Sequence, residues 1–153
     1  METDHSETLA EVFAEVLESL AFMFVDDPDE DEPFEPDGGA ILAVMKFTGP
    51  FNGELAIAAP DEMCPELAAN VLGLEPDDEI VQANPYDALK ELLNVACGNL
   101  LTAIAGDEPV FDLTPPEVAP MDAAAWNAMK EAGGAVPFLV DDQPVLLRLT
   151  TSE

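Results

Sequence analysis

Basic residues are scarce in this 153-residue chain, which has 4 Lys and Arg against 33 Asp and Glu and a formal net charge of -29. Nucleic acids and anionic membrane surfaces are bound through cations that neutralise phosphate, so we expect neither as a partner. Strong acidity also keeps proteins soluble and occurs in halophilic adaptation. The charge therefore excludes classes of partner without naming one.

Histidine and cysteine are also few, with only His5, Cys64 and Cys97. The chain has no Gly-x-Ser-x-Gly motif, no glycine-lysine phosphate loop and no paired-cysteine motif. The common nucleophilic, P-loop and zinc mechanisms therefore lack their parts. We predict that both cysteines are buried free thiols in a reducing cytoplasm and that the chain has no metal site of its own.

Targeting and membrane signals are missing as well. No N-terminal stretch joins basic residues to an apolar run, and no uninterrupted apolar segment approaches about 18 residues. We expect a cytoplasmic protein that neither crosses nor binds a membrane. Hydrophobic residues make up 48% of the chain, enough for residues 1–153 to form one domain with a substantial core.

A helix predicted over residues 87–104 organises the rest of the chain. At about 100° per residue, its two sides differ in character. The apolar side carries Leu89, Leu92, Leu93, Ala96, Leu100 and Ile104. The opposite side carries Asp87, Glu91, Asn94 and Gly98. We expect the first side to enter the core and the second to face a partner.

Glu91 and Asn94 lie three residues apart, so on a helix their side chains project next to each other. A carboxylate beside a carboxamide can grip a cation and orient a water, although such pairs also occur on ordinary solvated faces. Gly98 costs up to about 1 kcal/mol relative to alanine in a helix interior, which indicates a close approach of another backbone.

Two further segments frame this helix. The sequence FTGPFNG occupies residues 47–53, ELLNVACGN occupies 91–99, and LTPPEV occupies 113–118. In this order they resemble the CheX/CheC/FliY group of chemotaxis phosphatases, and CheX most of all, from about Gly38 to the C-terminus. The resemblance implies an α+β domain in which helices flank an antiparallel β-sheet, with a CheC-like layered arrangement.

The resemblance also implies a function, the hydrolysis of the aspartyl phosphate of a CheY-type response regulator in chemotaxis or two-component signalling. Glu91 would contact the regulator's active-site lysine, and Asn94 would orient the attacking water. Asp87 and Gly98 would take part in docking, and Asn99 would be a structural hydrogen-bonding residue. The protein would need no cofactor of its own because the phosphorylated partner supplies Mg²⁺.

Two other functions remain open from the sequence. The same fold could serve as a non-catalytic adaptor or flagellar-switch-like module that binds a regulator, or the chain could be an acidic α+β domain of unrelated role. Exposure distinguishes them in part, because Glu91 and Asn94 cannot dock if they are buried and satisfied internally. A homodimer through a sheet edge is a further possibility.

The remaining segments follow from local patterns. Residues 8–24 predict a helix with a Thr8–Glu11 capping box; its Glu15 and Glu18 match the spacing of the Glu91–Asn94 pair but lack the carboxamide, so we predict no second site. Residues 26–37 predict a mobile acidic loop without calcium-loop spacing.

Strands are predicted at 38–47, 52–59, 110–118 (broken by prolines), 135–140 and 144–150. Further helices are predicted at 61–72 and 121–131, with Trp126 as a core or interface anchor and not part of a ligand site.

Overall fold

The structure is a computed structural model that describes residues 5–28, 34–36, 38–132 and 135–152. Its helices are α1 (Ser6–Ala21), α2 (Met63–Leu72), α3 (Glu79–Ala83), α4 (Asp87–Ala105) and α5 (Ala123–Glu131). Its strands are β1 (Val25–Asp26), β2 (Ala40–Thr48), β3 (Asn52–Pro60), β4 (Asp112–Leu113), β5 (Glu117–Met121), β6 (Ala135–Val140) and β7 (Gln143–Ser152). The predicted α+β class, with helices flanking an antiparallel sheet, is confirmed.

The strands form one antiparallel sheet in the order β1-β6-β7-β3-β2-β4, and β5 also pairs with β2. Both β4 and β5 lie along the same neighbour because Pro115 and Pro116 interrupt what would otherwise be one strand. The predicted proline-broken strand at a sheet edge is therefore correct. A homodimer through this edge stays a prediction.

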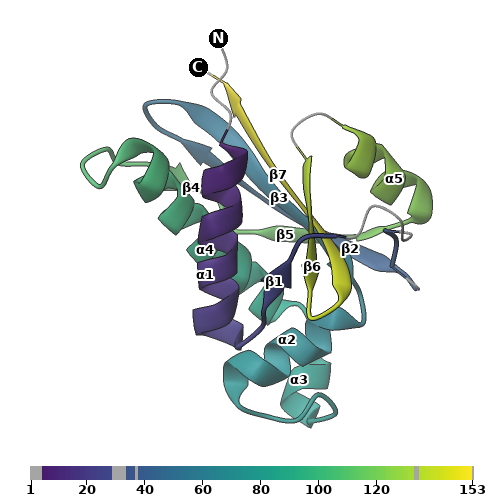
Figure 1. The fold of residues 1–153 in the computed structure, drawn as a ribbon. Coiled ribbons are helices and arrows are strands. Elements are labelled where there is room, and N and C mark those ends of the chain that lie inside the picture. The colour runs from purple at the N-terminus through teal and green to yellow at the C-terminus, as the bar shows by residue number, and fades with distance from the viewer. Residues whose placement is uncertain (1–4, 29–33, 37, 133–134, 153) are drawn as a thin grey trace.

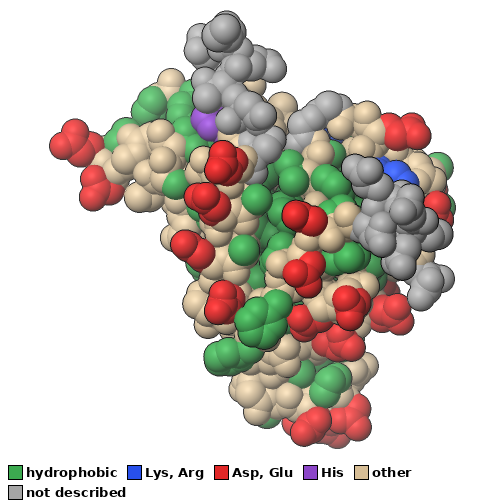
Figure 2. Space-filling model, viewed as in Figure 1, with side chains coloured by type: hydrophobic (Ala, Val, Ile, Leu, Met, Phe, Trp, Pro, Cys, Tyr) green, Lys and Arg blue, Asp and Glu red, His purple; other side chains and the backbone are tan. Residues whose placement is uncertain are grey.

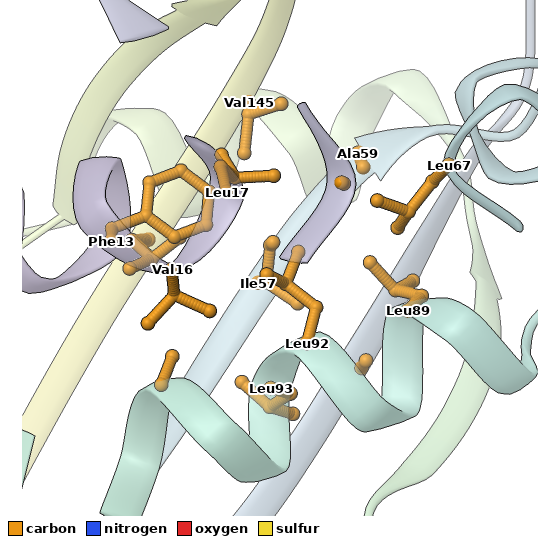
Figure 3. Packing of buried hydrophobic residues seen from close by; sticks show 14 of the residues in the cluster. Phe13, Val16, Leu17, Ile57, Ala59, Leu67, Leu89, Leu92, Leu93 and Val145 are labelled. Carbon is orange, nitrogen blue, oxygen red and sulfur yellow. The ribbon is translucent and has the colours of Figure 1, made fainter. Parts of the chain in front are cut away.

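Helices cover the two faces of the sheet unequally (Figure 1). Alternate side chains of each strand point to opposite faces, so Ile57 lies in the large core under α1, α2 and α4, while Ala56 and Ala58 lie in a smaller core under α5. Figure 3 shows α1 and α4 converging on β3 in the large core. The helix bearing the predicted site is thus held from below by most of the hydrophobic core.

The smaller core confirms the prediction made for Trp126. This side chain is 1% exposed and packs with Met129. Its indole Nε1 donates a 3.0 Å hydrogen bond to the carbonyl oxygen of Phe34, whose ring lies 5.9 Å from that of Trp126. This contact attaches α5 to the segment that precedes β2.

The first helix begins and ends earlier than predicted. Leu9 N–H donates to the carbonyl of His5, so Thr8 already lies inside the first turn and the Thr8–Glu11 capping box is wrong. At the other end Phe22 takes a left-handed conformation with φ of 56° and closes the helix. The chain must leave the helix there because β1 pairs with β6.

Two acidic segments also differ from simple loops. The acidic pattern of residues 75–79 is typical of a solvated loop, but Asp78 caps α3 by accepting a 2.9 Å hydrogen bond from Ile80 N–H, and α3 buries Val81. In the segment 26–37, Asp26 pairs with Leu139 in the sheet. Residues 29–33 and 37 of the predicted mobile loop lie outside the described residues, so its mobility stays a prediction.

Helix α4 has an apolar composition. Among the described helices, it alone is long and apolar enough to cross a membrane, with a mean hydropathy of 1.2 over 18 of its residues. This is weak evidence for a membrane span, because core helices pass the same test. Its buried residues contact α1, α2 and the sheet, which explains the composition without a membrane.

Candidate functional site

The start of α4 is fixed by a hydrogen bond across the fold. The Tyr86 hydroxyl, at the N-cap position, donates to Asp61 Oδ1 at 2.6 Å. This hydrogen bond, aided by desolvation, raises the pKa of Tyr86 to about 12. Asp61 precedes α2, so the bond ties together the first turns of α2 and α4. The position of α4 along the sheet is therefore set at its N-terminus as well as by its buried side.

The outward side of α4 presents the four residues selected from the sequence, and we call them the α4 stripe: Asp87, Glu91, Asn94 and Gly98. The first three are exposed and Gly98 is half-buried. Within the described part of the chain, neither the Glu91 nor the Asn94 side chain forms a hydrogen bond or an ion pair. The condition for docking, exposure without internal partners, is thus met for both.

Gly98 has no structural explanation within the described chain. A Cβ atom built at this position would meet nothing within 4 Å. The close backbone approach inferred from this glycine is therefore not made by another described segment of the chain. Its space lies open beside Asn94, one helical turn away.

Asn99 differs from the expectation of a structural role. Its side chain is exposed and makes no hydrogen bond to a described residue. At this point in the helix it is Thr102 that makes the side-chain contact, because its hydroxyl donates to the Gly98 carbonyl at 3.1 Å.

The two glycines of the FTGPFNG segment do have a structural explanation. A Cβ at Gly49 would come within 2.7 Å of Phe111 Cδ1, and a Cβ at Gly53 would clash with the Thr150 carbonyl and the Phe47 ring. Phe47, Phe51 and Phe111 pack edge to face with ring centroids 5.1 to 5.9 Å apart. These glycines therefore admit an aromatic cluster near the C-terminal end of α4.

Phe111 of this aromatic cluster also lines a pocket that the sequence did not predict. The pocket has a volume of about 200 Å³ and is lined by Gly98 and Thr102 from α4 and by Phe111 and Leu113 from the segment that follows. Val110 beside it is 81% exposed. The pocket lies next to the Gly98 end of the α4 stripe. It exists because the chain, after leaving α4, runs back to pair with the edge of the sheet at β2.

The LTPPEV segment, residues 113–118, is held against β2 by hydrogen bonds of Thr114. Thr114 N–H donates to the Lys46 carbonyl, and Lys46 N–H donates to Thr114 Oγ1, both at 2.9 Å. The threonine thus continues the ladder between β4 and β5, where the prolines cannot donate. Of the three segments that carry the resemblance, the two outer ones support the fold, and the middle one carries the exposed polar pair.

Other candidate chemistry is placed away from the α4 stripe. Glu15 and Glu18 are exposed on α1. Cys64 and Cys97 are buried free thiols, as predicted, and burial raises their pKa values to about 12 and about 11. Both thiols therefore stay protonated and unreactive near neutral pH. In the described residues no three His, Cys, Asp or Glu side chains gather where they could hold a metal ion.

Comparison with known protein families decides the relationship. The family described as chemotaxis phosphatase CheX matches residues 41–139, which include the α4 stripe. The chain belongs to the CheX family. The relationship proposed from the three sequence segments is confirmed.

Solved structures of CheX and related proteins share the fold. A chain of the CheX–CheY–BeF3–Mg complex from Borrelia burgdorferi is 20% identical, with a TM-score of 0.69, over 99% of this chain and 100% of that one. CheX from Desulfovibrio desulfuricans is 15% identical, with a TM-score of 0.69, over 98% and 100%. FliY from Thermotoga maritima is 12% identical, with a TM-score of 0.60, over 99% and 92%. No curated protein matches the chain.

Proposed function

We propose that this CheX family member hydrolyses the aspartyl phosphate of a CheY-type response regulator in the cytoplasm. The observation that carries the proposal is the exposure of Glu91 and Asn94 side by side on α4, without partners among the described residues. The family match and the CheX–CheY–BeF3–Mg complex of a relative support the choice of partner and reaction.

The chemistry asks little of the protein itself. An acyl phosphate needs a positioned water and compensation of charge, and the phosphorylated partner brings the Mg²⁺ that neutralises its own oxygens. Asn94 both donates and accepts hydrogen bonds, so its carboxamide can hold a water in line with the phosphorus atom. Because the core holds α4 in place, the helix does not have to reorganise when the partner docks. Less free energy is then needed to position the carboxamide for the reaction.

Glu91 and Gly98 serve docking in this proposal. The Glu91 carboxylate pairs with the lysine of the regulator's phosphorylation site, and Asp87 lies one turn before it at the rim of the contact. Gly98 leaves the backbone of α4 accessible, because nothing described in the chain fills the space a side chain would take. The pocket beyond it, about 200 Å³, is available to an apolar side chain of the partner.

The test measures the decay of a ³²P-labelled CheY-type regulator in the presence of Mg²⁺, with the wild-type protein, with Asn94→Ala and with Glu18→Ala. We expect the wild type and Glu18→Ala to accelerate decay equally, because Glu18 is an exposed residue at the matching place on α1. Asn94→Ala should retain binding but lose most of the acceleration.

The adaptor function makes the opposite prediction. If the wild-type protein binds the phosphorylated regulator in a pull-down or by fluorescence anisotropy but leaves its decay unchanged, the protein is a binding module. If Asn94→Ala accelerates decay as well as the wild type does, water orientation by Asn94 is wrong.

A further inference from the structure

The four basic residues of this acidic chain are unequally distributed. Lys46 and Arg148 project from the sheet face that α5 covers, on the same side as Ala56 and Leu146, and Lys130 lies in the last turn of α5 itself. On the face drawn in Figure 2, blue side-chain atoms lie beside α5 and red ones are scattered widely. Only the fourth basic residue, Lys90, belongs to the side of the molecule that carries the α4 stripe.

Two of the cations beside α5 have nearby carboxylates. Lys46 stands opposite Glu54 in the β2–β3 register, and Arg148 Nη2 lies 4.0 Å from Glu54 Oε1. Lys130 lies at the C-terminal end of α5, where the helix dipole favours a cation. Lys90 lies between Asp87, three residues before it, and Glu91, and like Lys46 and Lys130 it forms no ion pair with a described residue.

Lys90 lies beside the proposed water-orienting residue. At about 100° per residue, Asn94 lies between Lys90 and Glu91, about 40° from the first and about 60° from the second. Residues four apart on a helix are surface neighbours. Lys90 is half-buried, next to the buried Leu93, so its aliphatic stem can lie along the edge of the core while its ammonium group reaches toward the stripe.

A negatively charged protein that docks on a phosphorylated carboxylate must overcome like-charge repulsion. The net charge of -29 is unfavourable toward both the phosphoryl group and the carboxylates around it. A cation next to Asn94 makes the local potential less negative where the phosphoryl group enters, and close charges matter most because salt screens distant ones.

We propose that the Lys90 ammonium group binds the phosphoryl oxygens of the partner and gives the α4 stripe its preference for the phosphorylated over the unphosphorylated regulator. This inference rests on the proposed function, since it needs the partner to dock on α4. It adds a phosphate-binding residue to the exposed Glu91–Asn94 pair.

The experiment compares dissociation constants for a CheY-type regulator with and without bound Mg²⁺ and beryllofluoride, which imitates the phosphoryl group without being hydrolysed. The variants are Lys90→Met, which keeps the apolar stem, Lys90→Arg, which keeps the charge, and Lys130→Met as a control on α5. Thermal unfolding identifies a variant that fails to fold, and Lys90→Gln then replaces Lys90→Met as the neutral variant.

At low salt, we expect Lys90→Met to weaken binding of the loaded regulator about five- to tenfold and that of the unloaded regulator less than twofold. Lys90→Arg should bind within about twofold of the wild type, and Lys130→Met should be unchanged. Raising the salt to about 0.5 M should remove most of the difference between the wild type and Lys90→Met.

Each other outcome has a definite meaning. Equal losses for loaded and unloaded regulator, or an equal loss with Lys130→Met, would show a general charge effect and overturn the inference. If the wild type accelerates phosphoregulator decay and Lys90→Met binds the loaded form as well as the wild type, the inference fails while the proposed function stands. If the wild type neither binds nor accelerates decay, the proposed function fails and the inference fails with it.

Discussion

The two long helices, α1 and α4, are alike in position and different in what they present. Both bury an apolar side against the same face of the sheet, and Leu17 of α1 and Leu92 of α4 are each 0% exposed. Both also expose a polar pair at a spacing of three, Glu15–Glu18 on α1 and Glu91–Asn94 on α4. The surface chemistry therefore differs by one functional group, a carboxylate in place of a carboxamide.

The residues around the two pairs make the surfaces of α1 and α4 differ further. On α1 the exposed pair follows Glu7 and Glu11, which are also exposed, so the charged groups described on that side are all carboxylates. On α4 the pair is flanked by Lys90 and by Gly98, where the helix surface is open. An all-carboxylate side repels a phosphoryl group, and this explains why one of two similarly buried helices would serve the reaction.

The largest expected effect is a loss of stability, which should be about equal when either helix loses a buried leucine. Leu17→Ala and Leu92→Ala should each lower the free energy of unfolding by about 2–5 kcal/mol, because both leave a cavity in the same core. Urea denaturation followed by circular dichroism measures both. A loss from one helix alone would contradict the shared core.

Copying the α1 pattern onto α4 should have the next largest effect. Asn94→Glu should reduce the acceleration of phosphoregulator decay by on the order of 100-fold, since a carboxylate cannot donate a hydrogen bond to water and repels the phosphoryl oxygens. The decay assay measures it, with Glu18→Gln as the matched change on α1. Comparable activity of Asn94→Glu and the wild type would contradict the role of the carboxamide.

Two substitutions at Gly98 should affect stability and regulator binding differently. Gly98→Ala should raise the free energy of unfolding by up to about 1 kcal/mol, because alanine favours the helix and its Cβ meets nothing described. Gly98→Leu should weaken regulator binding about tenfold, because the larger side chain occupies the space left for the partner. Thermal unfolding and binding titration test the two effects; unchanged binding of Gly98→Leu would remove Gly98 from the contact.

The smallest effect is expected when the α4 pattern is copied onto α1. Glu18→Asn recreates the Glu-x-x-Asn spacing on an exposed site and should change the free energy of unfolding by less than about 0.5 kcal/mol. It should add no measurable phosphatase activity in an Asn94→Ala background, because α1 lacks the lysine and the open glycine. Recovery of activity in that double variant would show that the pair alone is sufficient.

Much of this architecture could be predicted from local patterns in the sequence. The α4 helix, the β2–β3 and β6–β7 hairpins, the proline-broken edge and the core position of Trp126 all follow from periodicity and turn residues, which act over a few neighbours. The fold was therefore predictable where local preference and burial agreed. The ends of α1 and the existence of α3 were not predicted, because pairing of β1 with β6 and burial of Val81 are long-range effects.

The sequence by itself determined which residues could carry the chemistry: the Glu91–Asn94 pair, the glycine one turn beyond it and the scarcity of cations. Only the tertiary structure decided that Glu91 and Asn94 face solvent, that Gly98 borders a pocket lined by Phe111, and that Lys90 is separated by the sheet from the other three basic residues. The physical reason is that helical spacing places neighbours within one turn, whereas exposure and pocket walls depend on segments brought together by the core.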